Sequence, residues 1–431
     1  MEPLNIGIAG LGTVGAATVM VLHEHADLLS SRCGRPIRVA AVSARNRDRD
    51  RGVKLSEIRW YDDPVDLARD PAVDVVVELI GGSDGPAREV VEAAISAGKH
   101  VVTANKAMMA LHGSALARRA DAAGVTLAYE AAVAGGIPAI KGIREGLAAN
   151  VFSSVVGILN GTSNFILSEM RETGRDFGDV LAEAQQLGYA EADPTFDVEG
   201  IDAAHKLALL AAIAFNVDVD FDSLHIEGIR QVSALDIAYA DELGFRIKLL
   251  AIARRGDGGL ELRVAPCMVP QERPIAKVEG VFNAVQATGD HVGQVMMVGQ
   301  GAGGGPTASA VVADIVDIAR GLRVPAFGFP ADALEPATVL PISARRGEYY
   351  VRLMVVDRPG VIADITAIMR DQSVSVESFL QRGRSPGDAV PLIIVTHDTT
   401  EAAMSRVLAA VGDLDHVVES PKMIRIERMV V

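Results

Sequence analysis

The chain has 431 residues, which is enough for two or three domains. Because 49% of the residues are hydrophobic and 23% are charged, the chain can bury large cores and does not belong to the disordered class. A formal net charge of -15, without a clustered basic face, argues against nucleic-acid binding.

The first third alternates apolar strands with amphipathic helices. Strands are expected over residues 4–10, 37–43, 73–80 and 99–105, and helices over residues 15–29 and 86–98. Continuous apolar strands between such helices indicate a parallel sheet covered on both faces. This part of the chain is expected to be one α/β domain over residues 1–130.

The middle of the chain has a mixed pattern. Long helices accompany strands expected over residues 153–159, 249–255 and 260–269, which indicates an α+β domain over residues 131–306. One of these helices includes the apolar run 207–217, which is too short for a bilayer span of about 20 residues. Residues 307–322 predict one amphipathic helix, and the Pro- and Ala-rich segment 323–347 predicts a linker.

The last segment, residues 348–431, predicts a small domain of its own. Its expected elements are strands 349–356, 374–382, 391–398 and 422–430, helices 359–371 and 399–412, and a turn at 385–388. The resulting βαββαβ order predicts a ferredoxin-like antiparallel sheet with helices on one face.

The cysteines and the N-terminus bear on the compartment. Cys33 and Cys267 are far apart and lack metal-like spacing, so neither a disulfide framework nor a metal site is expected. The chain enters its first strand at Leu4 without a basic and then apolar leader. A reducing cytoplasm is therefore expected, and no membrane association.

A glycine motif opens the first helix. Gly10, Gly12 and Gly15 have G-x-G-x-x-G spacing directly after a strand, the context that gives this motif weight. Glycines let the backbone approach a pyrophosphate, while the helix start, with Thr13 and Val14, supplies free N–H groups. A tight turn without a ligand is the alternative. The context favours nucleotide binding by a Rossmann-type domain.

The end of the second strand bears on cofactor choice. An Asp or Glu there would bind the ribose hydroxyls of NAD, but the strand ends at Ser43 and Arg45 follows. These two residues could hold a 2′-phosphate, which favours NADP(H) over NAD(H). An exposed arginine without a ligand is the alternative, and NAD(H) stays open.

Thr103 and Lys106 follow another strand of the parallel sheet. Ligands of open α/β sheets bind at the carboxyl ends of the strands. Lys106 could therefore meet the nicotinamide side of a cofactor and a substrate carboxylate. The alternative is a surface lysine at a helix start.

An acidic stretch over residues 191–206 ends in a single lysine. A calcium loop beginning at Asp193 fails, because Val198 and Ala204 stand where Gly and Glu are needed. Asp202 and Lys206 are four residues apart, on one helix face that also includes Glu199. A surface ion pair, worth about 0.3–0.5 kcal/mol, is one interpretation.

Proton transfer is the sharper interpretation of this stretch. A lysine beside a cofactor can exchange a proton with a substrate oxygen. Carboxylates nearby can bind the ammonium group of an amino-acid substrate.

Residues 184–206, AQQLGYAEADPTFDVEGIDAAHK, resemble the signature of homoserine dehydrogenases. Further blocks resemble the family in the same order, namely GLGTVG, TANKA, YEAAVAGGIPAIKGIREGL, ILNGTSNFIL and GQGAGGGPTASAVVADI. The resemblance spans residues 4–322, and the remaining tail resembles an ACT domain, a small regulatory module that commonly binds amino acids.

The resemblance implies an activity. Homoserine dehydrogenases reduce L-aspartate 4-semialdehyde to L-homoserine with NADPH or NADH, on the route to threonine and methionine. It also implies that residues 131–306 bind substrate and mediate dimerisation, that helix 307–322 packs back on the nucleotide domain, and that the protein is a homodimer or homotetramer. Threonine is the expected effector of the ACT domain, although this domain could also only dimerise.

The resemblance assigns roles to single residues. Lys206 is the implied proton donor, Asp202 its partner, and Lys106 a contact of cofactor and substrate as well as the alternative donor. The implied substrate ligands are Glu191, Asp197, Gly161 and Thr162. Asp193 and Glu199 are expected to serve the turn and the helix start instead.

Three more sets of residues follow from the resemblance. Gly301 and Gly303 resemble the loop that returns to the cofactor. A monovalent cation, usually sodium, would be bound by the Glu130 side chain and the backbone carbonyls of Val133, Gly135 and Ile137, where a glycine-rich hinge is the alternative. The effector loop would comprise Asp357, Arg358, Pro359, Gly360 and Val361.

Two rival functions can be weighed from the sequence. An aldehyde dehydrogenase that makes the same semialdehyde needs a cysteine nucleophile, and neither cysteine lies near the lysine motifs. A catalytically silent Rossmann–ACT sensor is the second rival. The intact Lys106, Asp202 and Lys206 argue against a silent sensor.

Overall fold

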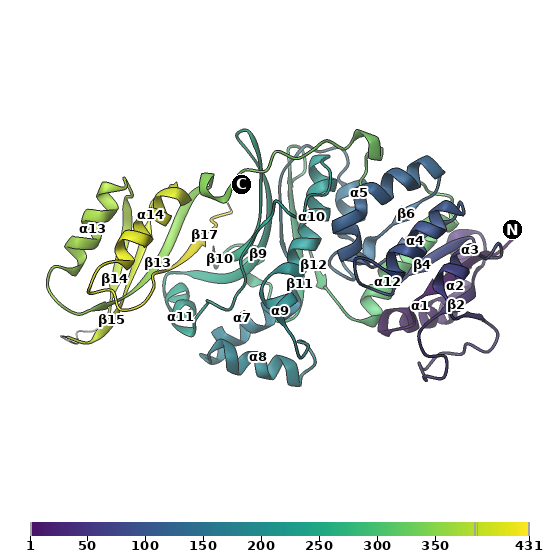
Figure 1. The fold of residues 1–431 in the computed structure, drawn as a ribbon, viewed down its shortest axis with the longest axis horizontal. Coiled ribbons are helices and arrows are strands. Elements are labelled where there is room, and N and C mark those ends of the chain that lie inside the picture. The colour runs from purple at the N-terminus through teal and green to yellow at the C-terminus, as the bar shows by residue number, and fades with distance from the viewer. Residues whose placement is uncertain (1, 383–384, 386, 430–431) are drawn as a thin grey trace.

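The computed structural model describes residues 2–382, 385 and 387–429. The molecule is elongated, with the N-terminal domain at one end, the C-terminal domain at the other and the middle domain between them (Figure 1). Within the described part of the chain, no helix combines the length and the apolar character that crossing a membrane requires.

The N-terminal domain is built on a parallel sheet of six strands in the order β3-β2-β1-β4-β5-β6. Its strands are β1 (Leu4–Ala9), β2 (Ile37–Ser43), β3 (Arg59–Tyr61), β4 (Val75–Glu78), β5 (His100–Thr103) and β6 (Leu127–Ala128). Its helices are α1 (Thr13–Glu24), α2 (Ala26–Cys33), α3 (Pro64–Arg69), α4 (Pro86–Ser96) and α5 (Lys106–Ala123). The strand order reverses between β1 and β4, where doubly wound sheets bind ligands. The single helix expected over residues 15–29 is divided at His25.

Helix α12 (Gly304–Ala319) belongs spatially to this domain. Val311 and Ile315 of α12 share a buried apolar cluster with Val19 and Leu22 of α1. The chain thus returns from the middle domain to cover the helix that follows the glycine motif.

The middle domain packs helices on one face of a mixed sheet (Figure 1). Its strands are β7 (Phe152–Ile158), β8 (His225–Ile226), β9 (Phe245–Gly256), β10 (Gly259–Pro270), β11 (Phe282–Gly289) and β12 (Gly293–Gln300). Its helices are α6 (Ala139–Lys141), α7 (Gly161–Thr173), α8 (Phe177–Gln186), α9 (Thr195–Val198), α10 (Ile201–Phe215) and α11 (Ala234–Glu242). The apolar run expected to be a buried helix forms most of α10, which is buried from Asp202 to Ile213.

The C-terminal domain has the βαββαβ order expected from the sequence. Its elements are β13 (Arg346–Val356), α13 (Val361–Asp371), β14 (Val376–Gln381), β15 (Ala389–Thr396), the short β16 (Thr399–Thr400), α14 (Glu401–Gly412) and β17 (Lys422–Ile426). The four long strands are antiparallel in the order β17-β13-β15-β14. Both helices pack on the same sheet through one apolar cluster. The turn expected at 385–388 lies partly outside the described residues.

The sheets of the middle and C-terminal domains are continuous. Strand β17 pairs with β13 on one side and, in parallel, with β10 on the other, through Cys267 opposite Arg425 and Met268 opposite Ile426. One sheet of eleven strands therefore runs through both domains. Sequence patterns predict β10, β13 and β17 but do not reveal this pairing.

The Pro- and Ala-rich segment over residues 323–347 is packed rather than free. Phe327 is fully buried, with its ring 5.6 Å from that of Tyr129. Further along, Val339 bridges to Leu260, and Leu340 N donates to the Leu260 carbonyl at 2.8 Å. Its composition predicts the absence of long elements correctly, but backbone pairing with β10 makes it part of the middle domain.

Candidate active site

A buried carboxylate, that of Asp202, lies between two lysines. Lys106 Nζ is 2.9 Å from Asp202 Oδ1, and Lys206 Nζ is 2.7 Å from Asp202 Oδ2. Lys106 starts α5 directly after β5, whereas Asp202 and Lys206 lie on α10. The side chain of Lys206 is 9% exposed and that of Lys106 is 36% exposed. Two motifs about a hundred residues apart thus meet at the carboxyl edge of the first sheet.

The two lysines differ in acidity because their surroundings differ. Burial lowers the pKa of Lys206, and the attraction of Asp202 offsets this only in part. Burial also acts on Lys106, but the charge of Asp202 prevails there and raises the pKa of Lys106. Asp202 itself is buried, yet the two ammonium groups hold its pKa well below its usual range. Lys206 is therefore the stronger acid of the two.

Asn160 joins the carboxylates of Asp202 and Asp197. Its Nδ2 donates to Asp197 Oδ1 and to Asp202 Oδ2, both at 2.8 Å. Its Oδ1 accepts from Ser163 N at 2.8 Å, which caps α7. The preceding carbonyl, that of Leu159, accepts from Lys206 Nζ at 2.6 Å. Sequence reasoning did not select Asn160, although an asparagine between an apolar strand and a helix is a recognisable cap.

Asp197 and Thr162 form the next layer of the site. Thr162 Oγ1 lies 3.2 Å from Asp197 Oδ2 and 2.7 Å from the Tyr189 carbonyl oxygen. Burial raises the pKa of Asp197 despite the hydrogen bond from Asn160. Gly161 starts α7, and a Cβ there would lie 2.8 Å from the carbonyl oxygen of Val281. A glycine thus allows α7 to begin this close to the neighbouring backbone.

The other acids of the stretch lie apart from Asp202. Glu191 is exposed, and its carboxylate has no hydrogen bond or ion pair with the residues that the structure describes. Asp193 Oδ1 accepts from Thr195 N at 3.1 Å, a local turn contact. Glu199 precedes α10 and pairs with Arg230. The expectation that Glu199 shares a helix face with Asp202 is therefore wrong, because Gly200, at φ 82°, separates α9 from α10.

The glycine motif leaves an open position at the N-terminus of α1. Gly10 has φ 102°, and a Cβ on it would lie 2.5 Å from the Leu79 carbonyl oxygen. A Cβ on Gly15 would lie 2.0 Å from the Gly10 carbonyl oxygen, whereas one on Gly12 would meet nothing within 4 Å. No side chain caps α1, so its first N–H groups, beginning at Thr13 and Val14, remain available to an anion. This geometry fits a pyrophosphate.

The residues considered for the ribose phosphate differ in exposure. Ser43 is 2% exposed, and its carbonyl accepts from Gly10 N at 2.8 Å. Arg45 is exposed at the end of the same strand. Arg51, in the arginine-rich stretch that follows this strand, donates from Nε to the Leu11 carbonyl at 3.1 Å and lies 5.6 Å from the centre of the Trp60 ring. Arg51 therefore contacts the glycine motif, Arg45 is exposed, and little of Ser43 is accessible.

Two further elements border the nucleotide crevice. Thr103 uses its hydroxyl internally, donating to Glu78 Oε2 at 2.5 Å and accepting from Asn105 N at 2.9 Å. A Cβ on Gly301 would lie 2.1 Å from Asn283, and Gly303, at φ 112°, precedes α12. Because α12 begins against Thr13, the loop 301–303 ends beside the glycine motif.

The side-chain ligand expected for the cation is a buried glutamate. Glu130 is 2% exposed, and its two carboxylate oxygens accept from Ile140 N at 3.0 Å and Lys141 N at 2.8 Å. Burial, with Asp314 nearby, raises the pKa of Glu130 to about 7.

The backbone carbonyls near Glu130 differ in their partners. Those of Val133 and Gly135 are in buried residues and accept no hydrogen bond from the part of the chain that the structure describes, whereas Ile137 O accepts from Ala139 N at 2.7 Å. Free carbonyl oxygens and a carboxylate are the kinds of ligand that a hard cation prefers. Among the described residues, no cluster of three or more His, Cys, Asp or Glu side chains could hold a metal ion.

The expected effector loop lies between β13 and α13. Asp357 Oδ2 accepts from Ser385 N at 2.8 Å, and Arg358 Nη2 lies 3.0 Å from His416 Nδ1. Pro359 and Gly360 are exposed, Gly360 has φ 98°, and α13 begins at the buried Val361. The loop thus presents an uncapped helix start, with Asp357 and Arg358 committed to neighbouring segments.

Comparison with known proteins places this geometry in a family. Residues 10–130 match the model of the NAD-binding domain of homoserine dehydrogenase, residues 138–316 that of homoserine dehydrogenase, and residues 349–416 that of the ACT domain. A homoserine dehydrogenase of Pseudomonas aeruginosa is 50% identical, with all of both chains covered.

Solved structures agree with these matches. A homoserine dehydrogenase from Thiobacillus denitrificans is 49% identical over 99% of both chains, with a TM-score of 0.94. A hyperthermophilic archaeal homoserine dehydrogenase in complex with NADPH is 27% identical, with a TM-score of 0.63, and covers 73% of this chain and 97% of its own. The chain therefore belongs to the homoserine dehydrogenase family, and it carries a C-terminal ACT domain.

Proposed function

We propose that the protein reduces L-aspartate 4-semialdehyde to L-homoserine by direct hydride transfer from NAD(P)H, with Lys206 as the proton donor. The observation that carries this proposal is the buried Lys106–Asp202–Lys206 arrangement beside the nucleotide crevice. A bound nicotinamide cofactor would supply the hydride. The chain itself has to position the aldehyde and neutralise the alkoxide that forms.

Lys206 suits the proton transfer. Asp202 and the Leu159 carbonyl hold its ammonium group at 2.7 and 2.6 Å, which fixes the direction of its remaining proton. Burial makes it a stronger acid than an ordinary lysine. Lys106, whose pKa is raised, would stay charged and contact cofactor and substrate. Lys106 as donor is the alternative assignment.

Carboxylates near the lysines would recognise the amino-acid part of the substrate. Asp197, oriented by Asn160 and Thr162, is the first candidate for binding the substrate ammonium, with Glu191 as a second ligand from the exposed side. Gly161 would keep the start of α7 close enough for backbone contact with the substrate.

NADP(H) is the proposed cofactor. Support comes from Arg45 and Arg51 beside the glycine motif and from the absence of an acid at the end of β2. Sodium is the proposed cation at Glu130, with the carbonyls of Val133 and Gly135 as its further ligands. It would fix the turn that leads from the first domain into the middle domain.

Threonine is the proposed effector of the ACT domain, as the end product of the pathway in which the enzyme would act. The uncapped start of α13 at Gly360 supports binding of a carboxylate there. Inhibition requires that threonine bind two states of the enzyme unequally.

One assay tests these proposals together. Purified protein is incubated with homoserine and either NADP or NAD, with and without threonine, and reduced cofactor is followed by absorbance. We expect turnover with both cofactors, a higher kcat/KM with NADP, and inhibition by threonine. Absence of turnover with either cofactor would favour a silent Rossmann–ACT sensor.

A further inference from the structure

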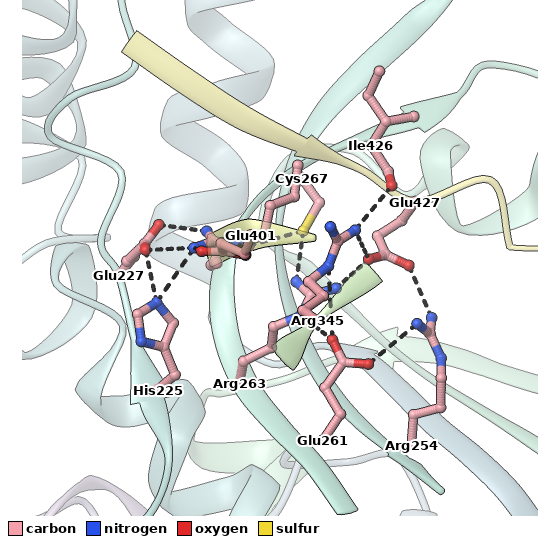
Figure 2. A network of polar contacts seen from close by, with 12 residues as sticks. His225, Glu227, Arg254, Glu261, Arg263, Cys267, Arg345, Glu401, Ile426 and Glu427 are labelled. Atoms are coloured by element: carbon pink, nitrogen blue, oxygen red, sulfur yellow. Dashed lines mark hydrogen bonds and ion pairs between the residues drawn. The ribbon is translucent and has the colours of Figure 1, made fainter. Parts of the chain in front are cut away.

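One buried arginine connects the ACT domain to the middle domain. Arg425, on β17, donates to Glu227 from Nη1 at 2.6 Å and from Nη2 at 2.8 Å. Its Nε donates to Glu401 at the start of α14 at 2.9 Å. Figure 2 shows Glu227 and Glu401 close together in this network, in which His225 also contacts Glu227 at 2.6 Å. The guanidinium is thus held by one carboxylate from each domain.

Glu227 begins a loop, residues 227–230, that packs against Val198 and Glu199 at the end of α9. Ile229 N donates to the Val198 carbonyl at 2.8 Å. A Cβ on Gly228 would lie 2.4 Å from the Val198 carbonyl oxygen and 2.6 Å from Glu199 Cα, so the two backbones are in contact. Arg230 adds an ion pair with Glu199. Loop 227–230 and residues 198–199 therefore cannot move independently.

The segment under this loop is the junction that orients the site carboxylates. Asp197 lies on α9, Asp202 on the first turn of α10, and Gly200 separates the two helices. A small rotation at Gly200 would change the distance between Asp197 and Asp202, and with it the position of Lys206. Asn160 bridges both carboxylates and would be strained by such a rotation.

We propose that Glu227 and Arg425 are positioning residues, through which the C-terminal strand of the ACT domain holds the junction between α9 and α10 in its catalytic geometry. This inference rests on the proposed roles of Asp197 and Asp202. It assigns the ACT domain a part in the basal reaction, separate from any effector. The coupling runs through successive direct contacts, from Glu401 to Arg425, from Arg425 to Glu227, and from loop 227–230 to Val198.

Glu227→Gln in the full chain tests the inference. Gln keeps the size of the side chain but removes the charge that Arg425 and His225 share, and the partly exposed position tolerates a neutral group. We expect KM for homoserine to rise by about fivefold or more, the lower end of typical coupling between sites. KM for the cofactor should stay within about twofold, because loop 227–230 lies away from the glycine motif. A purely structural role would lower the melting temperature without this separation of the two KM values.

Arg254→Gln is the matched control. Arg254, on β9, contacts Glu427 at 2.8 Å, two residues after Arg425 and just past the end of β17, and it also joins the two domains (Figure 2). It makes no hydrogen bond to loop 227–230 among the described residues. We expect this variant to keep both KM values. Equal changes in the two variants would overturn the inference, since loosening of the domain junction would then suffice.

Asp202→Asn separates this inference from the proposed function. If KM for homoserine in Glu227→Gln stays within twofold of the parent value, the positioning role is overturned. If Asp202→Asn has at the same time lost turnover, the proposed chemistry still stands. Undiminished turnover in Asp202→Asn would remove the basis of both.

Discussion

At the scale of single residues, Asp202 contacts two lysines whose pKa values are shifted in opposite directions. It neutralises Lys106, which is partly exposed, more effectively than Lys206, which is desolvated. A site with one lysine whose pKa is raised and one whose pKa is lowered can bind an anionic group and transfer a proton at the same time. This division of roles can be tested at Lys206.

Lys206→Met should lower kcat by about 10²–10⁴, the usual contribution of a general acid or base. Cofactor affinity should persist, because Lys206 contacts Asp202 and Leu159 and not the glycine motif. Steady-state turnover and cofactor titration by fluorescence measure the two quantities. Lys106→Met is the comparison variant, in which KM for substrate and cofactor should rise. A Lys206→Met enzyme with near-normal kcat would transfer the donor role to Lys106.

Glu130 makes stability depend on pH and, if the cation binds, on sodium. Its carboxyl has a pKa of about 7 in the folded protein against an ordinary value of 4.5, so the folded state binds this proton more tightly. Stability from this residue is therefore present at low pH and declines as the pH rises from about 4.5 to about 7. The difference between these two pKa values corresponds to about 3 kcal/mol. A cation beside the ionised carboxylate would recover part of that loss.

We expect sodium chloride to raise the melting temperature more at pH 8 than at pH 5, relative to tetramethylammonium chloride at equal ionic strength. Sodium binds only the folded protein in this scheme, so its effect follows mass action. Differential scanning calorimetry measures the shift, and Glu130→Gln should remove its pH dependence. The same sodium effect at both pH values, or in the Gln variant, would contradict a cation site at Glu130.

At the scale of elements, the turn between β1 and α1 contains one glycine that the fold requires, Gly15, and one that leaves space for a ligand, Gly12. Gly12→Ala should leave the melting temperature nearly unchanged, because its φ is −76° and its Cβ would meet nothing within 4 Å, yet it should weaken cofactor binding by occupying the open position. Gly15→Ala should destabilise the protein, since its Cβ would lie 2.0 Å from a carbonyl oxygen. Thermal melts and cofactor titration distinguish the two. A strongly destabilised Gly12→Ala would show that this glycine serves the fold.

Helices and strands can be predicted from the sequence where the apolar pattern and the Gly or Pro residues at its ends indicate the same element. Strands β1 and β2 and helix α4 lie within one or two residues of expectation, because a Gly or Pro marks at least one end of each element. Strands β11 and β12 are not expected from the sequence, because glycine and glutamine residues interrupt their apolar pattern. Pairing holds them in the sheet, since β11 pairs with β7 and the edge strand β12 pairs with β11. The break between α1 and α2 also has no local breaker in the sequence.

The candidate site shows the same limit. The pair Asp202–Lys206 follows from helical spacing alone, as the sequence indicated. The contact of Lys106 with Asp202, and the bridging by Asn160, require three segments to meet and cannot be read from spacing. Glu199 was misplaced for a related reason, because the left-handed Gly200 ends one helix before the next begins.

At the scale of the whole molecule, the ACT domain is built into the catalytic sheet. Strand β17 lies between β10 and β13, and Tyr350, Ile424 and Ile426 share an apolar cluster with Leu262 and Val264 of the middle domain. The archaeal relative covers 73% of this chain and 97% of its own, so it is the shorter of the two proteins. In this chain, however, removal of residues 349–431 would remove an inserted strand together with Arg425. Loss of threonine inhibition in such a truncated enzyme would therefore say little about where threonine binds.

Truncation is informative when it is combined with Glu227→Gln. In the full chain, the substitution removes the ion pair of Glu227 with Arg425, and in the chain ending at Glu348 this ion pair is already absent. We therefore expect KM for homoserine to rise in the truncated enzyme and to change no further when Glu227→Gln is added, a non-additive result typical of residues that share one contact. Circular dichroism and thermal melts first establish that the truncated chain is folded, and steady-state kinetics of the four proteins give the coupling. Additive effects would mean that Glu227 acts on the site without the ACT domain, and the C-terminal strand would then have no part in positioning Asp197 and Asp202.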